Sequence, residues 1–513
     1  MTGDGLGKFR SAVEHDEEED DMLSNILLVS ALAGFLLPLL LGLLVSRVKR
    51  GKPLSGFYTR PLCWGVTPFA LILFVWEIAC MGLATAAAMA GEATDKHLMK
   101  GLGAAASLAA AASMGFLGKH GVHTAFGVSL ELAYHVHAFF GTACLLVGAA
   151  HGIAAIAVEG IEKNLRQTRL LVGLIGTVLM LIGVLPGLLH KVAPRCMRYD
   201  AFKMLHSFSA VGYLFIILHV LLLAVDKGHL PAMVALALNG VALVVFCMQR
   251  MHALVSTRRV TLVRSEVVSD PVSTHLDMDL RAPGFRFQPG QWVRLHIPSL
   301  GMVGHPLTIV PTDSDEVLRF IVKPFGAFTT AMMSADLTGK AIRVEGPYGH
   351  PGVAPALPWA SAVAFIVGGV GATTALALAP AVKAAGLPVY LFWSLRSPSL
   401  FRHCSRVFAP CVEHDRSHCQ ITLGDAESAR GGAGSLAVAP ARKSIADWLG
   451  EVVPETERRA RAKTARTGLF IFVCGPSSMA ADARAACRQL SKKHPDCALQ
   501  VHGETFDFLA PST

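Results

Sequence analysis

Charged residues are scarce in this chain of 513 residues: Asp, Glu, Lys and Arg make up 16%, against 52% hydrophobic residues. The length exceeds one ordinary domain, and the apolar residues lie mostly in the first half. The shortage of charge therefore indicates a membrane protein whose second half is soluble. The net charge of +9 does not indicate nucleic-acid binding, because basic residues gather beside the apolar runs, where they face anionic lipid.

A disulfide framework is also lacking, because the 11 cysteines show no such pattern, and reduced thiols are expected. Cys404, Cys411 and Cys419 lie among histidines, but their spacing fits no familiar zinc-ligand motif, so a zinc site is disfavoured. The polar, acidic residues 1–22 lack the basic region of a signal peptide and predict a disordered tail. The first apolar run is then expected to remain as a membrane anchor.

Seven apolar runs approach the ~20 residues that a helix needs to cross the bilayer core. They cover about residues 23–45, 66–90, 98–117, 130–158, 170–190, 202–225 and 230–249. The third run is rich in Ala and Gly, which suits close helix packing. Basic residues follow the first and seventh runs and precede the sixth, so seven spans place them all on one side. That side is expected to be cytosolic, with residues 250–513 inside.

Two of these runs each carry a pair of histidines, and an ionisable residue inside a span is a candidate functional residue. His137 and His151 are 14 residues apart, or ~21 Å along a helix. His206 and His219 are 13 residues apart, or ~20 Å. If both helices start on the cytosolic side, His137 lies level with His206, and His151 with His219. Neutral imidazole is a good axial ligand of haem iron, so each level pair is expected to hold one haem b.

The second pair has a geometric problem, because 14 residues return to nearly the same helix face but 13 miss it by roughly 140°. This predicts a kink near Gly212, or imidazoles that reach their haems differently. The alternative is that these histidines only cap helices or hydrogen-bond within a bundle. A lone histidine would favour that alternative, whereas two pairs at near-equal spacing favour ligation. His135 is a spare and is assigned no haem.

The second half of the chain predicts two architectures in succession. Residues 258–350 contain short strands between turn signals, which is typical of an antiparallel barrel. Residues 360–510 alternate strands and helices, which is typical of a nucleotide-binding α/β domain. Residues 425–467, rich in Ala, Gly, Arg and Glu, predict an inserted loop that is helical near Ile445–Leu449 and otherwise mobile.

Two turns between a strand and a helix are candidates for phosphate binding, because backbone amides and the helix N-terminus favour an anion there. A glycine cluster can equally be a tight turn, but the strand–turn–helix setting favours the functional interpretation. The candidate residues are Gly368, Gly369, Gly371 and Thr373 in one turn, and Gly326, Thr329 and Thr330 in the other.

Six short motifs in the second half of the chain form a set. They are His305-Pro306-Leu307-Thr308, Pro289-Gly290-Gln291, Glu345-Gly346-Pro347-Tyr348-Gly349, the glycine loop at 368–371, Val473-Cys474-Gly475-Pro476 and Glu504-Thr505-Phe506. Together with the histidine pairs, this set resembles the ferric reductase and NADPH oxidase family. The resemblance covers about residues 60–510, apart from 425–467. Leu307 replaces the usual Phe of the flavin-binding signature, and Thr374 the usual Pro after the glycine loop.

The resemblance implies an enzyme that carries electrons from NADPH through FAD and two haems. In this family pattern the flavin is positioned by His305, Pro306, Leu307 and Thr308, and its pyrophosphate by Gly326, Thr329 and Thr330. The nicotinamide is framed by Cys474 and Phe506, beside Gly475 and Pro476. Arg396, just after a predicted strand, is expected to meet the 2′-phosphate of NADPH.

The expected fold class is a membrane α-helical bundle of about seven spans with a six-helix haem core, followed by a ferredoxin-reductase-like module. That module combines an antiparallel β-barrel FAD domain with an α/β NADPH domain. The expected segments are the tail 1–22, an extra span and basic loop 23–60, the haem core 61–250, the barrel 251–355 and the α/β domain 356–513.

The expected activity is reduction of an acceptor on the far side of a membrane, with the FAD and NADPH domains in the cytosol. Ferric or cupric chelates are the first choice, and the plasma membrane is the expected location. Production of superoxide from dioxygen is the close alternative. A non-enzymatic haem carrier or proton channel is the remote one, because it leaves the flavin signature without a role. The oligomeric state and any partner subunit stay open.

Overall fold

The structure is a computed structural model that describes residues 95–115, 130–192, 197, 199–227, 230–312, 314, 316–349, 357, 359–412, 419–423, 436, 438, 443–462 and 467–504. The tail and the first two predicted spans lie outside the described residues. The chain divides into two compact units, Met1–Met251 and His252–Thr513. This division falls one residue from the predicted boundary between the haem core and the barrel. The predicted boundary at 355/356 also lies outside the described residues.

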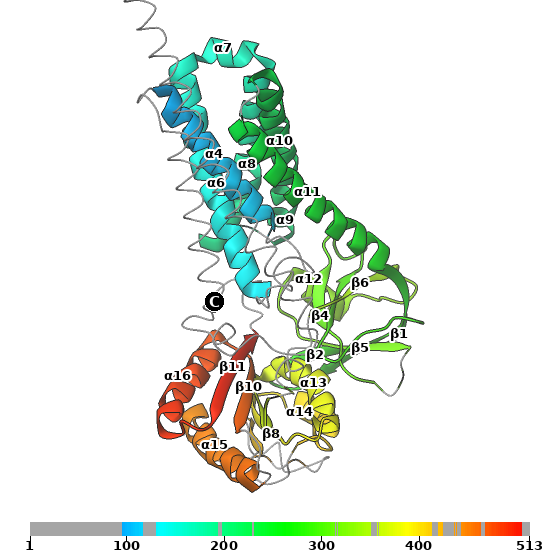
Figure 1. Cartoon of the computed structure of the whole chain (residues 1–513). Coiled ribbons are helices and arrows are strands. Elements are labelled where there is room, and N and C mark those ends of the chain that lie inside the picture. Colours follow the sequence, from blue (N-terminus) through cyan, green and yellow to red (C-terminus); the bar gives the residue numbers. More distant parts are fainter. Residues whose placement is uncertain are drawn as a thin grey trace, which may run out of the picture. The chain divides into compact units, whose positions relative to one another are not determined.

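The described part of the first unit is built of helices (Figure 1). They are α4 (Asp95–Gly115), α6 (Leu130–Glu159), α7 (Ile161–Arg166), α8 (Thr168–Val192), α9 (Tyr199–His206), α10 (Phe208–Lys227) and α11 (Leu230–Ser256). Among the described residues, four segments could cross a membrane by length and composition: Val136–Glu159, Thr168–Leu189, Ala201–Val225 and Ala232–Ser256. They correspond to the fourth to seventh predicted runs. The third run forms α4, whose alanines at 109–112 are buried as close packing requires.

Glycines let α8 and α10 approach backbone to backbone. A Cβ at Gly183 would lie 2.4 Å from the backbone N of Ser209, and one at Gly212 would lie 2.9 Å from the backbone N of Met180. No real side chain tolerates the first distance, so these glycines set how closely the two helices pack.

The predicted kink near Gly212 is wrong. The helix breaks five residues earlier, at Ser207, between α9 and α10. The hydroxyls of Ser207 and Ser209 donate to the carbonyls of Met204 and His206, at 2.5 and 2.6 Å. These bonds satisfy backbone oxygens at the break, which inside a bilayer have no water to bond. The break changes the phase of the helix between His206 and His219, as the 13-residue spacing demands.

The second unit begins with an antiparallel barrel that confirms the predicted fold. Its six strands pair in the order β4-β3-β6-β1-β2-β5, and a bridge between Val310 and Arg319 links its two ends. Helix α12 packs against the barrel, with Phe328 and Met332 inside the barrel core. The elements are β1 (Thr257–Ser269), β2 (Thr274–Arg281), β3 (Trp292–His296), β4 (His305–Thr308), β5 (Val317–Val322), α12 (Ala327–Ser334) and β6 (Ile342–Tyr348).

A five-stranded parallel sheet follows, in the order β11-β10-β7-β8-β9. Alternate residues of β7 face opposite layers: Phe365 packs with α13 and α14, and Ile366 with α15 and α16. The elements are β7 (Ala362–Gly368), η2 (Gly369–Gly371), α13 (Ala372–Ala384), β8 (Val389–Leu395), α14 (Pro398–Phe408), β9 (Cys419–Leu423), α15 (Ile445–Ala462), β10 (Gly468–Cys474), α16 (Ser477–Lys493) and β11 (Ala498–Glu504). This is the predicted α/β domain.

The prediction of an inserted, mobile loop needs a correction at α15. The helix extends to Ala462, well beyond the predicted turn, and buries Trp448, Leu449, Val452 and Val453 against the sheet. Their spacing places all four on one helix face. Residues 445–462 are therefore a structural layer of the α/β domain.

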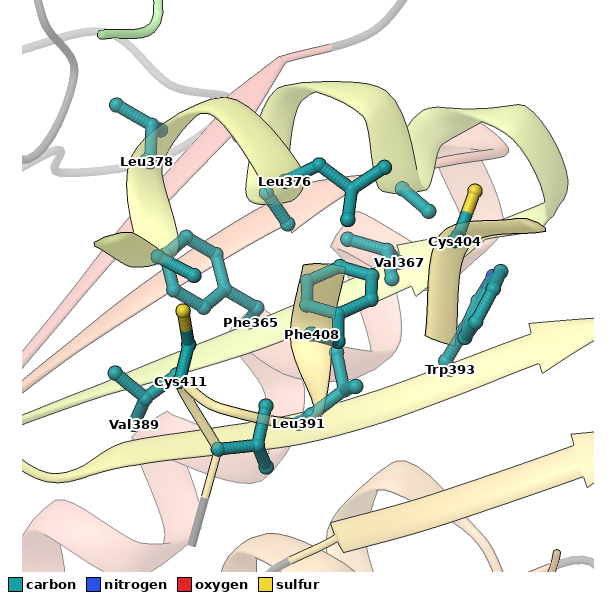
Figure 2. Close-up of a cluster of buried hydrophobic side chains, with 14 of the residues drawn as sticks. Phe365, Val367, Leu376, Leu378, Val389, Leu391, Trp393, Cys404, Phe408 and Cys411 are labelled. Carbon is teal, nitrogen blue, oxygen red and sulfur yellow. The ribbon is translucent and has the colours of Figure 1, made fainter. Parts of the chain in front are cut away.

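The cysteines that were considered for zinc belong to the hydrophobic core. Figure 2 shows Cys404 and Cys411 among Phe365, Trp393 and Phe408. Burial raises the pKa of Cys404, and it raises that of Cys419 to about 12. The buried, protonated thiols pack here as small hydrophobic side chains.

Val389, on β8, belongs to the hydrophobic core drawn in Figure 2, and its substitution tests this packing. The substitution Val389→Ala removes fully buried methyl groups and should lower the free energy of unfolding by about 1.5–3 kcal/mol. The same substitution at Val263, which is 58% exposed, should cost less than about 0.5 kcal/mol. Denaturant unfolding of the detergent-purified chain, followed by tryptophan fluorescence, measures both. Equal costs would contradict the packing described.

Candidate functional site

The four predicted histidines of the helical unit come together as two pairs. The ring centroids of His137 and His206 are 6.1 Å apart, and those of His151 and His219 are 6.3 Å apart. The pairing by level that the spacing predicted is therefore present. Two metal–nitrogen bonds of about 2 Å, plus the distance from each nitrogen to its ring centre, span about this separation. The separation within each pair therefore suits one metal ion between the two rings.

One backbone contact recurs at all four rings. Nδ1 lies within hydrogen-bonding distance of a carbonyl oxygen in every case: Ser113 for His137 (2.9 Å), Met99 for His151 (2.8 Å), Gly183 for His206 (2.9 Å) and Arg169 for His219 (2.7 Å). Because a carbonyl only accepts, Nδ1 carries the proton, and Nε2 keeps its lone pair. Such a contact is typical of metal-ligating histidine, because it fixes the tautomer and orients the ring.

Glycines on neighbouring helices make room for the two rings of the second pair. A Cβ at Gly103 would lie 3.0 Å from Cε1 of His151, and one at Gly173 would lie 2.8 Å from Nδ1 of His219. A side chain at Gly173 would push the His219 ring out of place. The helix surfaces are thus shaped to the imidazoles.

These donors suit haem better than a bare ion. In the part of the chain that the structure describes, no group of three or more His, Cys, Asp and Glu side chains gathers to hold a metal. Two imidazoles alone leave most coordination positions open, and a porphyrin supplies the remainder. His135 has no described side-chain position, so its role as a spare stays a prediction.

The predicted flavin strand and the predicted pyrophosphate turn also meet. His305, the first residue of β4, stacks on Phe328 of α12, with ring centroids 4.0 Å apart. Pro306 and Thr308 pair with Arg294 and Trp292 on β3, while Leu307 packs against the barrel core. One edge of the barrel therefore carries both parts of the expected FAD site.

Thr329 has a local role that the sequence did not reveal. Its hydroxyl accepts the amides of Phe325 and Gly326, at 2.8 and 3.0 Å, and caps α12. These donors are therefore taken in the structure described, and a phosphate would meet the following amides of the helix N-terminus instead. The hydroxyl of Thr330 lies on an exposed residue of the same turn.

The motif at the end of the barrel forms a buried polar cluster. Glu345 accepts a bond from Tyr348 (2.5 Å) and lies 2.9 Å from Nε2 of His296. Burial and the neighbouring Glu345 carboxylate raise the pKa of Tyr348, so its hydroxyl stays protonated and donates. The cluster ties β3 to β6 beside the flavin strand.

The glycine loop and the Cys-Gly-Pro motif lie together at the carboxyl ends of β7 and β10, which are neighbouring parallel strands. A Cβ at Gly371 would lie 2.4 Å from the carbonyl oxygen of Cys474, and one at Gly368 would lie 3.1 Å from Pro476. Gly475 is also closely packed, because a Cβ there would lie 3.2 Å from the backbone N of Gly368. The loop needs glycine for contact with the second motif, in addition to any contact with phosphate.

Three further candidates differ in what the structure shows of them. Thr373 is buried, and its hydroxyl donates to the carbonyl of Val370, so it serves the turn itself. Arg396 follows β8 and is exposed. Phe506 lies outside the described residues, and its place beside the nicotinamide remains a prediction.

Sequence reasoning missed Trp393, whose indole Nε1 donates to the carbonyl of Gly369 at 3.1 Å and so holds the glycine loop. It also missed the buried network in which Asn239 accepts from Tyr213 (2.9 Å) and donates to Ser107 (2.8 Å), joining α4, α10 and α11. Polar side chains at these positions inside apolar helices were the available signal for that network.

Residues 255–352 match a family described as an FAD-binding domain, which agrees with the barrel and its flavin strand. Curated relatives include dual oxidase 1 of Homo sapiens, 26% identical over 190 residues, and dual oxidase 1 of Sus scrofa, 26% identical over 164 residues. The matches cover 35% and 31% of this chain, but only 12% and 10% of those proteins. The likeness therefore concerns a small part of each relative.

Similar solved structures include a flavohemoglobin from Malassezia yamatoensis with bound FAD and heme, at 13% identity and a TM-score of 0.37, covering 79% of this chain and 97% of that one. Another is a ferredoxin NADP+ reductase from Neisseria gonorrhoeae with bound FAD and NADP, at 14% identity and a TM-score of 0.35, covering 48% of this chain and 98% of that one. Scores this low establish no shared overall fold. The ferredoxin-reductase-like fold class rests on the barrel, the parallel sheet and the FAD-binding match.

Gly173 tests the histidine geometry. The substitution Gly173→Ala places a methyl group against the His219 ring and should reduce the predicted haem content of two per chain towards one, as His219→Leu should. Pyridine haemochrome assay measures haem, and flavin absorbance should be unchanged. The matched control is Gly152→Ala, because nothing lies within 4 Å of its Cβ position. Two haems retained in Gly173→Ala and His219→Leu would show that His219 is no ligand.

Proposed function

We propose that this chain is a transmembrane flavocytochrome that oxidises cytosolic NADPH and delivers single electrons to an acceptor across the membrane. FAD, two haems b and NADPH are its proposed cofactors. The observation that carries this proposal is the arrangement of four imidazoles, paired at 6.1 and 6.3 Å, each with Nδ1 bonded to a backbone carbonyl. Histidines that only stabilise a helix bundle would not need the same tautomer at two depths.

Each proposed cofactor supplies one kind of chemistry. A nicotinamide gives up a hydride, FAD accepts electrons in pairs and releases them singly, and haem iron carries one electron at a time. The protein's part is to bind and orient these groups. His305 to Thr308 would position the flavin beside α12, and the loops at Gly368–Gly371 and Cys474–Pro476 would hold the nucleotide. His137 and His206 would hold one haem, and His151 and His219 would hold the other.

Ferric chelates, or cupric ones, are the proposed acceptors. The described segment between α6 and α8 supports this choice, because it contains only the six-residue helix α7. So short a segment makes no folded lid, and an open haem edge suits an acceptor too large for a closed pocket. Charge adds little to this argument. Lys163 pairs with Glu159, and Arg166 with Glu162, so these four residues carry no net charge.

The second candidate function is an oxidase that makes superoxide from dioxygen. The observation in its favour is the similarity to dual oxidase 1, with 26% sequence identity over 190 residues. The reductase and oxidase proposals share every cofactor and differ only in the acceptor. The plasma membrane is the proposed location, and lipid the proposed surrounding of the helices.

Arg396 tests the nicotinamide assignment. The substitution Arg396→Ala removes a charge-assisted contact with the 2′-phosphate and should weaken NADPH binding by roughly 10- to 150-fold, equivalent to about 1.5–3 kcal/mol. NADH lacks that phosphate and should change little. Fluorescence titration with NADP+ and NAD+, which differ by the same 2′-phosphate, gives the dissociation constants to compare. Equal weakening of both would remove Arg396 from this role.

The acceptor is tested by supplying NADPH to the purified, haem-loaded chain in liposomes. Reduction of ferric citrate should proceed at the same rate with and without superoxide dismutase, because iron is reduced directly. Superoxide release in air should be a minor product. Iron reduction that disappears when the dismutase is added would identify dioxygen as the acceptor and favour the oxidase.

A further inference from the structure

Within the second unit, the turn between β1 and β2 holds the start of α14 through a single carboxylate. Oδ2 of Asp270 accepts from the hydroxyls of Ser397 and Ser399, at 2.5 and 2.6 Å, and from the amide of Ser399 at 3.2 Å. Oδ1 accepts from the amides of Val272 and Ser273 in its own turn, at 2.9 and 2.8 Å. Asp270 belongs to the barrel, and the serines belong to the α/β domain.

This carboxylate is charged. Burial alone would raise the pKa of Asp270, but the hydrogen bonds from Ser397, Ser399, Val272 and Ser273 outweigh it and hold the pKa well below its usual range. Asp270 therefore places a full negative charge at the N-terminus of α14, where the helix dipole also favours it.

The position matters because Ser397, the N-cap of α14, directly follows Arg396. In dinucleotide-binding folds, an acidic residue at the end of the second strand contacts the ribose 2′-hydroxyl of NAD, whereas an arginine nearby accommodates the 2′-phosphate of NADP. Here β8 is the second strand of the domain in sequence, and it ends before an arginine. The acidic residue is present as well, but another domain supplies it.

We propose that Asp270 is a specificity-determining residue that limits the preference for NADPH, so that the chain oxidises NADH as well. This deepens the proposed function and rests on it. Two effects act in the same direction. The charge of Asp270 repels a 2′-phosphate at Arg396, and its oxygens take the serine hydroxyls and the helix amide that such a phosphate would otherwise bond.

The size of the first effect follows from Coulomb's law. A unit charge about 10 Å from a phosphate charge changes the binding constant by roughly 2- to 15-fold, for effective dielectric constants between about 80 and 20. Salt screens this interaction at such distances, so the effect should shrink as ionic strength rises.

The test measures equilibrium binding of NAD+ and NADP+ to the full chain, purified in detergent with FAD, so that no turnover is involved. The quantity compared is the ratio of the dissociation constant for NAD+ to that for NADP+. In the unmodified chain this ratio should lie within about tenfold of one. The substitution Asp270→Asn should raise it by roughly 2- to 15-fold at low salt, and by less at high salt.

Two further variants separate specificity from structure. Asp270→Glu keeps the charge and should leave the ratio near that of the unmodified chain. Asp277→Asn removes a charge of the same kind from β2, where Asp277 lies 3.0 Å from Nδ1 of His403, also on α14. His403 is six residues beyond Ser397, about 9 Å along the helix, so the ratio should change less.

Each outcome is decisive. If Asp270→Asn weakens both nucleotides equally, or lowers the ratio, the carboxylate is only structural and the proposal falls. If Asp270→Asn does not fold, Asp270→Ser takes its place, with thermal unfolding as the check and the same rise in ratio expected. If neither nucleotide binds any variant, the nucleotide site itself fails. Loss of FAD or haem with a normal ratio would count against the proposed function alone.

Discussion

The histidines of the helical unit depend on bonds between imidazole Nδ1 and backbone carbonyls, and each bond needs a carbonyl that a neighbouring helix can spare. A helical carbonyl normally accepts a bond from the amide four residues later, so a second acceptor bond uses its remaining lone pair. The four carbonyls come from three places: Met99 and Ser113 on α4, Gly183 in α8, and Arg169 at the start of α8. Helices α4 and α8 are thus required for the histidines of α6, α9 and α10 to face one another. Their glycines and alanines then follow, because only small residues let the rings approach so closely.

The sequence was sufficient to predict which histidines pair, but not how the second helix brings its two histidines to their partners. Spacings of 14 and 13 residues placed His137 level with His206 and His151 level with His219, because helical rise is constant. The same arithmetic showed that the second helix must change phase. It did not show where, since glycine was taken as the signal for a kink, whereas hydroxyls at Ser207 and Ser209 satisfy the broken turn. Serine in an apolar helix is ambiguous, because it often bonds a preceding carbonyl without any break.

The soluble half shows a similar division. Strand periodicity and turn residues gave the barrel and the parallel sheet, because these signals are local. Helix α15 was predicted only near Ile445–Leu449 and its remainder was taken for a mobile loop, because its many arginines and glutamates hid the apolar face that Trp448 and Leu449 continue with Val452 and Val453. Asp270 carried no signal at all. Its partner Ser397 is 127 residues away, and a contact between two domains leaves no periodicity in either segment. The glycine loop was recognised, but its contact with Cys474 and Trp393 depends on which strands are neighbours.

The bond from Trp393 to Gly369 has a further consequence for how the protein can be observed. An indole whose N–H donates to a carbonyl has an emission spectrum that depends on that bond, and here the carbonyl belongs to the loop that would receive a dinucleotide. The chain has six tryptophans, and Trp393 is fully buried, so its emission is shielded from solvent quenchers. Trp393 is therefore an intrinsic fluorophore, one of the six tryptophans, whose surroundings include the glycine loop.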